Sequence, residues 1–227
     1  DNTTDGNQSY TIVLAAASSS DSDYNNNNPS DISLSNLDDE WGGAKQTGSS
    51  KADQPYGIAV DSRSNIYVAG RTYGNMDGNS NPSGSTVGDI LFIKYSFQGS
   101  IQWLKQIGED ALQEYSYGVT VDTSDNVFIT GWVTAGLNGV ASNGDSDMFL
   151  VKYNSAGVIQ WTKLMGTTED EIGYDVAIDS SGNAYVTGFT SGTLDGTSAG
   201  TSDIFLVKYN SSGVMQWTRQ LGTSYHD

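Results

Sequence analysis

Short apolar runs separated by polar turns dominate the chain. Between residues 174 and 221 four runs follow one another: Tyr174 to Ile178, Ala184 to Phe189, Ile204 to Tyr209 and Val214 to Leu221. All are rich in β-branched or aromatic residues, and tight turns separate them, such as DSSGN at 179–183 and NSSG at 210–213. No segment carries apolar residues at helical spacing over about 11 positions or more. The pattern predicts an all-β chain of short antiparallel strands joined by hairpins.

The polarity of single runs predicts where each strand lies. IFLVKY, Ile204 to Tyr209, is almost continuously apolar, which is typical of a strand buried on both faces. VMQWTRQL, Val214 to Leu221, alternates apolar and polar residues. We therefore expect it to be an outer strand with one wetter face.

The four-run unit occurs three times. SDMFLVKYNSAGVIQWTKLMG at 146–166 and SDIFLVKYNSSGVMQWTRQLG at 202–222 are close copies, and GDILFIKYSFQGSIQWLKQIG at 88–108 is a looser one. The equivalent tryptophans Trp103, Trp161 and Trp217 lie 58 and 56 residues apart. Four antiparallel strands repeating at roughly 40–60 residues indicate β-propeller blades. One blade cannot bury both of its faces, so blades are stable only beside other blades.

The copies resemble the bacterial seven-bladed beta-propeller (SBBP) repeat. The resemblance is carried by YGIAVDSRSNIYVAGRTYG at 56–74, YGVTVDTSDNVFITGWVTAG at 117–136 and YDVAIDSSGNAYVTGFTSG at 174–192, each followed by the strand pair quoted above. It implies blades at about 56–108, 117–166 and 174–222 within a propeller domain at 41–227. It also implies a large exported bacterial protein, but it indicates almost nothing about biochemical activity.

One further strand is expected before the first blade. EWGGAKQTG, Glu40 to Gly48, aligns Trp41 with the blade tryptophans and predicts an extra fourth strand at 41–48. Three whole blades with one extra strand leave three explanations open: a piece of a longer protein, a six-bladed ring of two copies, or an open head-to-tail filament. All three predict a partner for the Trp41 strand, because an unpaired edge strand is a template for pairing.

Residues 1–40 differ in character from the repeats. Two strand-like runs, Ser9 to Ala16 and Asp31 to Asn36, flank a polar loop and resemble the C-terminal hairpin of a Calx-β/immunoglobulin-like domain. Since a two-stranded hairpin is marginal alone, further strands are expected from upstream or from another copy. In Calx-β domains an acidic cluster at this end contributes to calcium binding. The matching residues are Asp38, Asp39 and Glu40, with Asp21, Asp23 and Asp31 as further candidates; the alternative is a solvated acidic linker.

Composition narrows the class of partner. The 227 residues include 10 Lys and Arg against 27 Asp and Glu, and the net charge of −17 argues against nucleic acid and anionic membrane surfaces. There is no cysteine, and no apolar run reaches the roughly 18 residues that membrane insertion needs. We expect an extracellular or cell-surface protein whose partners are other copies of itself or, alternatively, glycans.

Residues suited to catalysis are few. The single histidine is His226, and the chain has no P-loop, dinucleotide fingerprint or zinc motif. A catalytic site is asymmetric, so it would show as departures from the repeat. The departures Arg71, Met76, Asp77 and Glu114 form no recognisable acid/base set. We therefore expect no enzymatic activity.

Polar and aromatic residues that recur in every copy are expected to be structural. The pairs Asp61–Asn65, Asp122–Asn126 and Asp179–Asn183 should cap the first hairpin, with Gly or Asn at positive φ, rather than form metal loops. A second set should pack between blades rather than bind carbohydrate: Tyr95, Tyr153, Tyr209, Trp103, Trp161 and Trp217. Buried lysines need partners, so Lys94, Lys152 and Lys208 are expected to pair across blades with Asp89, Asp147 and Asp203.

These features favour a non-enzymatic extracellular structural or adhesive repeat protein that assembles into a filament or surface layer by strand sharing between copies. The alternative is a glycan- or protein-binding propeller module of a larger bacterial surface adhesin, with Trp132 and Phe189 as contacts. A third interpretation is a fragment of an exported hydrolase or lyase.

Overall fold

The chain divides into two compact units, residues 1–46 and residues 47–227. The computed structural model describes residues 8–12, 32–36, 46–76, 87–108, 112–196 and 200–224. In the first unit β1 (Gln8–Ile12) pairs antiparallel with β2 (Ile32–Asn36), with Tyr10 opposite Leu34. The predicted hairpin is therefore present, while its membership of a Calx-β/immunoglobulin-like domain stays a prediction.

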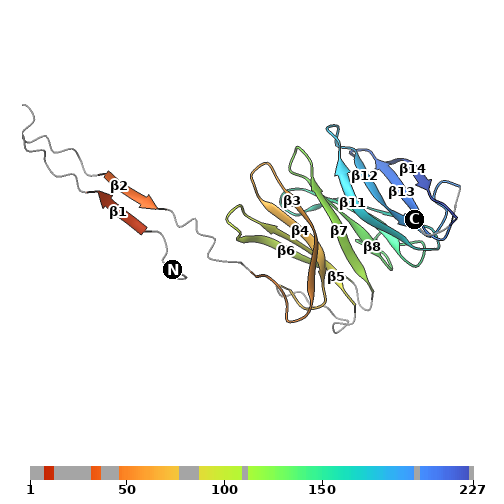
Figure 1. The fold of residues 1–227 in the computed structure, drawn as a ribbon, viewed down its shortest axis with the longest axis horizontal. Helices are drawn as coiled ribbons and strands as arrows, with labels where there is room; N and C mark the ends of the chain where they lie inside the picture. The colour runs from red at the N-terminus through yellow and green to blue at the C-terminus, as the bar shows by residue number, and fades with distance from the viewer. Residues whose placement is uncertain are drawn as a thin grey trace, which may run out of the picture. The chain divides into compact units, whose positions relative to one another are not determined.

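The second unit contains three four-stranded antiparallel sheets, each with its strands in chain order. The first blade comprises β3 (Asp53–Val60), β4 (Ile66–Thr72), β5 (Asp89–Tyr95) and β6 (Ile101–Ile107). The second comprises β7 (Glu114–Val121), β8 (Val127–Val133), β9 (Asp147–Tyr153) and β10 (Ile159–Met165). The third comprises β11 (Glu171–Ile178), β12 (Ala184–Thr190), β13 (Asp203–Tyr209) and β14 (Met215–Leu221). Figure 1 shows the three sheets side by side, and the described residues contain no helix, so the predicted all-β fold class is confirmed.

The extra strand predicted at 41–48 falls mainly outside the described residues. Residues 46–48, which the structure describes, are not in a strand. A partner for the Trp41 strand therefore stays a prediction.

An aspartate closes the first hairpin of each blade. The Asp61 backbone N–H donates to the Asn65 carbonyl at 3.0 Å, and the Asp61 side chain accepts from the N–H groups of Arg63 and Asn65 at 2.9 and 2.8 Å. The residue at positive φ is the one before the asparagine: Ser64, Asp125 or Gly182. The predicted capping role is confirmed, but Gly takes the positive φ in only one of these three hairpins and Asn in none.

A β-bulge interrupts the first strand of every blade. The pairing register shifts between Pro55 and Gly57, between Ser116 and Gly118, and between Gly173 and Asp175. The unpaired residue of each bulge is a tyrosine: Tyr56, Tyr117 or Tyr174. The strand is also paired on the N-terminal side of the bulge. Each first strand therefore starts at Asp53, Glu114 or Glu171 rather than at the tyrosine where the sequence pattern placed its beginning.

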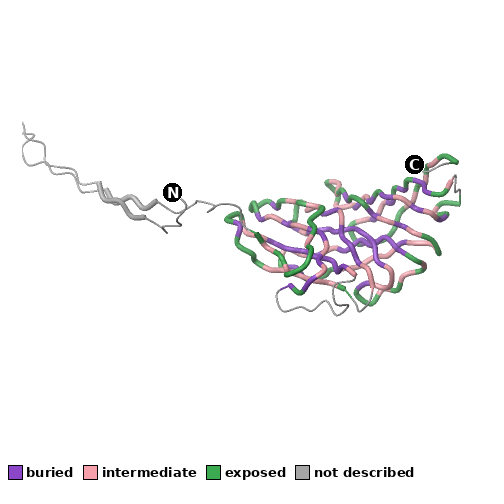
Figure 2. Tube along the Cα trace, turned by 60° about the horizontal axis from the view of Figure 1, so that its bottom comes forward, coloured by how far each residue is buried: buried purple, intermediate pink, exposed green. Residues whose placement is uncertain are grey.

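The core lies between neighbouring blades. One buried cluster joins the first and second blades and includes Phe92, Ile129 and Phe149; another joins the second and third and includes Phe128, Leu150 and Phe205. Figure 2 shows the buried segments running through the middle of this unit. Sheets that stack face to face in this way bury apolar side chains from both inner faces.

The third strand is buried on both faces in the first and second blades but not in the third. In β5 every residue but Tyr95 is buried, because Met76 packs with Leu91 and Ile93 on the outer face. In β9 every residue but Lys152 is buried. In β13, Phe205 and Val207 are buried but Ile204 and Leu206 are 49% and 38% exposed. The prediction of two buried faces is therefore wrong for IFLVKY itself, because no blade covers its outer face. The outer strands β6, β10 and β14 are mostly half-buried or exposed, as the alternating pattern predicts.

Candidate functional site

The predicted calcium ligands Asp38, Asp39 and Glu40 lie outside the described residues, as do Trp41 and His226. The further calcium candidates and Asp77 also lie outside them. Calcium binding therefore stays a prediction. Within the part of the chain that the structure describes, no three His, Cys, Asp or Glu side chains gather closely enough to hold a metal ion. No helix in that part is long and apolar enough to cross a membrane.

The buried lysines pair with the hairpin aspartates of their own blade. Lys94 Nζ lies 3.8 Å from Asp61 Oδ2, and Lys152 Nζ lies 3.6 Å from Asp122 Oδ2. The predicted pairing with Asp89 and Asp147 is therefore wrong, because the hairpin aspartate reaches back along the same sheet. The contact that Lys94 makes across the blade boundary is a hydrogen bond of 2.9 Å to the Ser155 carbonyl.

Four of the six recurring aromatic residues lie in the clusters between blades, as the sequence predicts: Trp103 and Tyr153 in one, Trp161 and Tyr209 in the other. Tyr95 packs instead with Leu91 and Ile93 of its own blade, and Trp217 with Tyr185 of its own blade. Phe92 lies 5.0 Å from Trp103 and 5.2 Å from Tyr153 between ring centroids, and Trp161 lies 5.8 Å from Phe128. Tyr153 is fully buried, and burial raises the pKa of its hydroxyl far above the usual range. Rings that bury this much area contribute chiefly to cohesion between blades.

A buried carboxylate pair lies at the junction of the second and third blades. Burial raises the pKa of Glu171, and the nearby charge of Asp147 raises it further, while hydrogen bonds from Thr190 and Thr167 act in the opposite direction. Burial also raises the pKa of Asp147. The Glu171 backbone N–H donates to the Ser146 carbonyl at 2.7 Å, so Glu171 also links the third blade to the second through the backbone.

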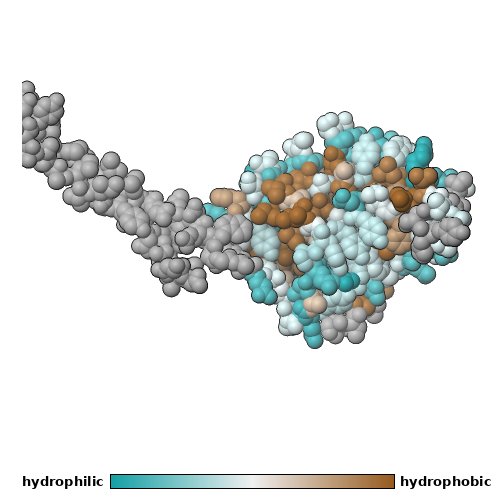
Figure 3. All heavy atoms as spheres, viewed as in Figure 1, coloured by the Kyte–Doolittle hydropathy of each residue, from teal (hydrophilic) through white to brown (hydrophobic). Residues whose placement is uncertain are grey.

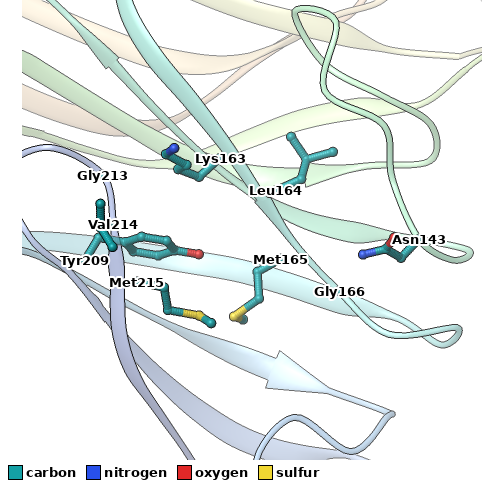
Figure 4. Close-up of a pocket in the computed structure, with 9 residues that line it drawn as sticks. All are labelled: Asn143, Lys163, Leu164, Met165, Gly166, Tyr209, Gly213, Val214 and Met215. Atoms are coloured by element: carbon teal, nitrogen blue, oxygen red, sulfur yellow. The ribbon is translucent and has the colours of Figure 1, made fainter.

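Open grooves repeat at the outer side of each blade junction. A groove of about 470 Å³ lies between β10 and the third blade; Figure 4 shows the Tyr209 hydroxyl and the Met165 and Met215 side chains pointing into it. The equivalent groove between the first two blades measures about 280 Å³ and is lined by Lys105 and Tyr153. Because the same groove recurs at equivalent positions, it follows from blade geometry and defines no specific chemistry.

The bulge tyrosines form a ladder along the first strands. The ring centroids of Tyr56 and Tyr117 are 4.9 Å apart, and those of Tyr117 and Tyr174 are 5.6 Å apart. Tyr56 is 46% exposed and Tyr174 50% exposed. Bulges often re-aim side chains at sheet edges, and here they bring one aromatic ring per blade to a shared surface.

Departures from the repeat gather beside this tyrosine ladder. Arg71 occupies the position of Trp132 and Phe189, and its guanidinium carbon lies 4.2 Å from the Tyr115 ring centroid and 5.2 Å from that of Tyr73. The sequence pattern singled out Arg71 but missed Gln54, Tyr73 and Tyr115. Comparing the copies position by position finds them, since Gln54, Tyr115 and Ile172 are equivalent, as are Tyr73, Thr134 and Ser191.

Exposed apolar side chains lie on the outer face of β13 in the third blade and on the outer face of β3 in the first blade, whereas Leu91 and Ile93 of β5 are buried with Met76. On the third blade Ile204 and Leu206 are exposed, whereas their counterparts Met148 and Leu150 in the second blade are fully buried. On the first blade Ile58 is 71% exposed, whereas its counterpart Val119 is buried against a neighbour. Figure 3 shows hydrophobic residues gathered over the β3 side of this unit.

Comparison with known proteins identifies the repeat. The SBBP beta-propeller repeat model matches residues 43–75, 102–136 and 160–194. The second and third matches run from an outer strand, β6 or β10, into the first two strands of the next blade. The chain therefore contains three segments similar to the beta-propeller repeat, and its four-stranded antiparallel sheets are consistent with propeller blades.

Curated relatives are far longer than this chain. An uncharacterized WD repeat-containing protein of Acanthamoeba polyphaga mimivirus is 26% identical over an alignment 227 positions long. The alignment covers 79% of this chain and 16% of that protein. The regulatory protein FlaEY of Caulobacter vibrioides is 34% identical over 100 residues, 40% of this chain and 10% of that protein. A protein of unknown function from Bacteroides caccae has a solved structure that matches with a TM-score of 0.43 at 11% identity, over 78% of this chain and 49% of its own.

Proposed function

We propose that the chain is a non-enzymatic extracellular structural or adhesive repeat protein whose end blades bind other copies head to tail. The observation that carries this proposal is the exposure of Ile204 and Leu206, whose counterparts in the preceding blade are fully buried beneath a neighbour. In the second blade this apolar face is covered by the third blade. The equivalent exposed face of the third blade is therefore a docking surface for another blade.

The opposite end offers the complementary surface. Within the chain the face of β9 that holds Leu150 packs against the face of β11 that holds Val176. The outer face of β13 is equivalent to the former, and the outer face of β3 is equivalent to the latter. A second copy can therefore repeat the β3 part of the internal junction, with its first blade on the third blade of its neighbour. The β5 part is already covered within the copy, because Leu91 and Ile93 pack with Met76. Such a heterologous contact gives either a ring or a filament.

Composition supports an extracellular setting for this assembly. The net charge of −17 and the absence of cysteine suit a protein exposed to an oxidising, salt-containing environment. At about 0.15 M ionic strength charges beyond roughly 8 Å are largely screened, so the acidic surfaces do not prevent apolar faces from meeting.

Negative-stain electron microscopy tests the assembly at low and high protein concentration. We expect rings or filaments that lengthen or become more abundant with concentration, and their loss in Leu206→Asp. Uniform single particles at every concentration would contradict the proposal.

Glycan binding is the second candidate, and the tyrosine ladder favours it. Exposed aromatic rings with a polar tip suit the apolar face of a sugar and its hydroxyl groups. Tyr174 is the better probe, because Trp132 is only 9% exposed and its loss would also damage packing. A glycan array in which binding is lost on Tyr174→Ala but retained in Tyr185→Ala supports this candidate, and no binding to any glycan opposes it.

A further inference from the structure

We propose that Gln54, Arg71, Tyr73 and Tyr115 form a binding site for the carboxylate of an acidic sugar, and that the adjacent tyrosine ladder carries the sugar rings. This inference rests on the second candidate function, glycan binding. It adds the chemical class of the ligand.

The four residues meet although they come from two blades. Arg71 on β4 pairs directly with Gln54 on β3, and Tyr115 is on β7 of the next blade. At the next junction the equivalent residues are Tyr115, Trp132, Thr134 and Ile172, none of which carries a cation. A site for a single ligand on a repeat protein must break the repeat, and these departures break it at one place.

The Arg71 guanidinium is held in place by Gln54 and by aromatic rings, and no carboxylate of the described residues pairs with it. Its Nε donates to Gln54 Oε1 at 2.7 Å, and the same oxygen accepts from the Tyr56 hydroxyl at 3.0 Å. The ion pairs found among the described residues join Lys94 to Asp61 and Lys152 to Asp122, so no described carboxylate lies within 4.0 Å of Arg71. A planar guanidinium held on aromatic rings is preorganised for a planar carboxylate.

Two phenol groups complete the polar side of the site. The Tyr73 and Tyr115 hydroxyl oxygens are 3.1 Å apart, so one donates to the other and one donor remains for a ligand. Burial raises the pKa of Tyr115 to about 12, which keeps it protonated, and therefore a donor, at neutral pH.

The sugar ring has a surface beside the cation. Tyr56 contacts Arg71, whose guanidinium carbon lies 5.7 Å from its ring centroid, and Tyr56 begins the tyrosine ladder that continues to Tyr117 and Tyr174. A polymer of uronic acids offers a carboxylate for Arg71 and apolar ring faces for the tyrosines. The net charge of −17 opposes an anionic ligand at long range, so we expect binding to strengthen as salt is raised to about 0.15 M, where that repulsion is screened.

Isothermal titration with an oligogalacturonate tests the proposal on the whole chain. We expect binding that weakens about tenfold or more when the carboxyl groups of the probe are methyl-esterified, because a charge-assisted contact is lost. Arg71→Gln should weaken binding of the acid by a similar factor and leave binding of the ester unchanged. Tyr73→Phe, which keeps the ring and removes only the hydroxyl, should weaken binding of the acid by a smaller factor. Arg63→Gln, on a hairpin turn of the same blade, is the matched control. It should change the affinity for neither the acid nor the ester.

Different outcomes would overturn the carboxylate site and glycan binding as such. Equal affinity for acid and ester, binding of a sulfated oligosaccharide as tight as the uronate, or no effect of Arg71→Gln and Tyr73→Phe would overturn the carboxylate site while glycan binding stands. Neutral glycans that bind where the uronate does not would overturn it as well. If no glycan of any charge binds the folded chain, the second candidate function fails with it.

Discussion

At the scale of single residues, equivalent lysines differ in what surrounds them. Lys94 is buried, pairs with Asp61 and donates to the Ser155 carbonyl of the next blade. Lys208 is half-buried on the outer side of the third blade, over the Tyr185 ring at 5.2 Å. The same residue type therefore joins two blades at one position and faces solvent at the other.

Lys94→Met should lower the free energy of unfolding by about 1–3 kcal/mol, because Asp61 loses its counter-ion and the Ser155 carbonyl loses a donor. The matched control Lys208→Met should change it by less than about 0.5 kcal/mol. Urea unfolding measures both. If Lys94→Met were neutral or stabilising, neither the ion pair with Asp61 nor the hydrogen bond to the Ser155 carbonyl would be an essential contact.

The raised pKa values of buried acids predict a pH dependence. A carboxyl group whose pKa is higher in the folded state than in the unfolded chain stabilises the fold when protonated, and this stabilisation is lost as pH rises through the folded pKa. Glu171 has a raised pKa relative to 4.5. The stability of the wild type relative to Glu171→Gln should therefore fall as pH rises from 4.5.

Asp179 supplies the opposite control. Hydrogen bonds from Asn183 lower its pKa from 3.8 to about 2, so its contribution is present above 3.8 and is lost as pH falls toward 2. Thermal unfolding of the wild type, Glu171→Gln and Asp179→Asn across pH measures both trends. Parallel curves for the wild type and Glu171→Gln would show that Glu171 titrates normally.

At the scale of elements, position in the row of blades decides what a strand contributes. β9 and β13 share the pattern F-L-V-K-Y, yet Leu150 is fully buried and Leu206 is not. Leu150→Ala should lower the free energy of unfolding by about 2–5 kcal/mol, because it removes buried methyl groups and leaves a cavity. Leu206→Ala should cost less than about 1 kcal/mol in the dilute chain. Similar losses for the two variants in urea titrations would mean that the outer face of β13 is already covered.

The strands could be predicted from sequence because their information is local. Apolar runs, hairpin aspartates and turn glycines all act within about ten residues, and they placed the interiors of β3 to β14 correctly. The lysine partners could not be predicted, since Asp61 approaches Lys94 only after the strands pair. The bulges escaped prediction for the same reason: Tyr56 reads as an ordinary strand residue until the register of its partner strand is known.

The asymmetric site was predictable only in part. Arg71 stands out in the sequence because a cation replaces an aromatic residue. Gln54 and Tyr115 do not stand out, because residues at the first strand vary without effect on the strand itself. Their convergence on Arg71 depends on how the next blade packs, which no local pattern encodes.

At the scale of the whole molecule, the central claim is that the end blades bind other copies head to tail. Each copy then needs two different faces, one around Ile58 and one around Leu206. Replacing either residue by aspartate places a charge in one face and leaves the other intact. Because both side chains are exposed in a single copy, neither substitution should impair folding.

Sedimentation velocity of the two variants, alone and mixed, tests this claim most directly. The wild type should form oligomers that grow with concentration, while Ile58→Asp and Leu206→Asp should each remain monomeric at concentrations where the wild type assembles. An equimolar mixture should form dimers and nothing larger, because one intact face of each variant meets the complementary face of the other. Monomers only in the mixture, a monomeric wild type at every concentration, or dimers of one variant alone would contradict head-to-tail assembly.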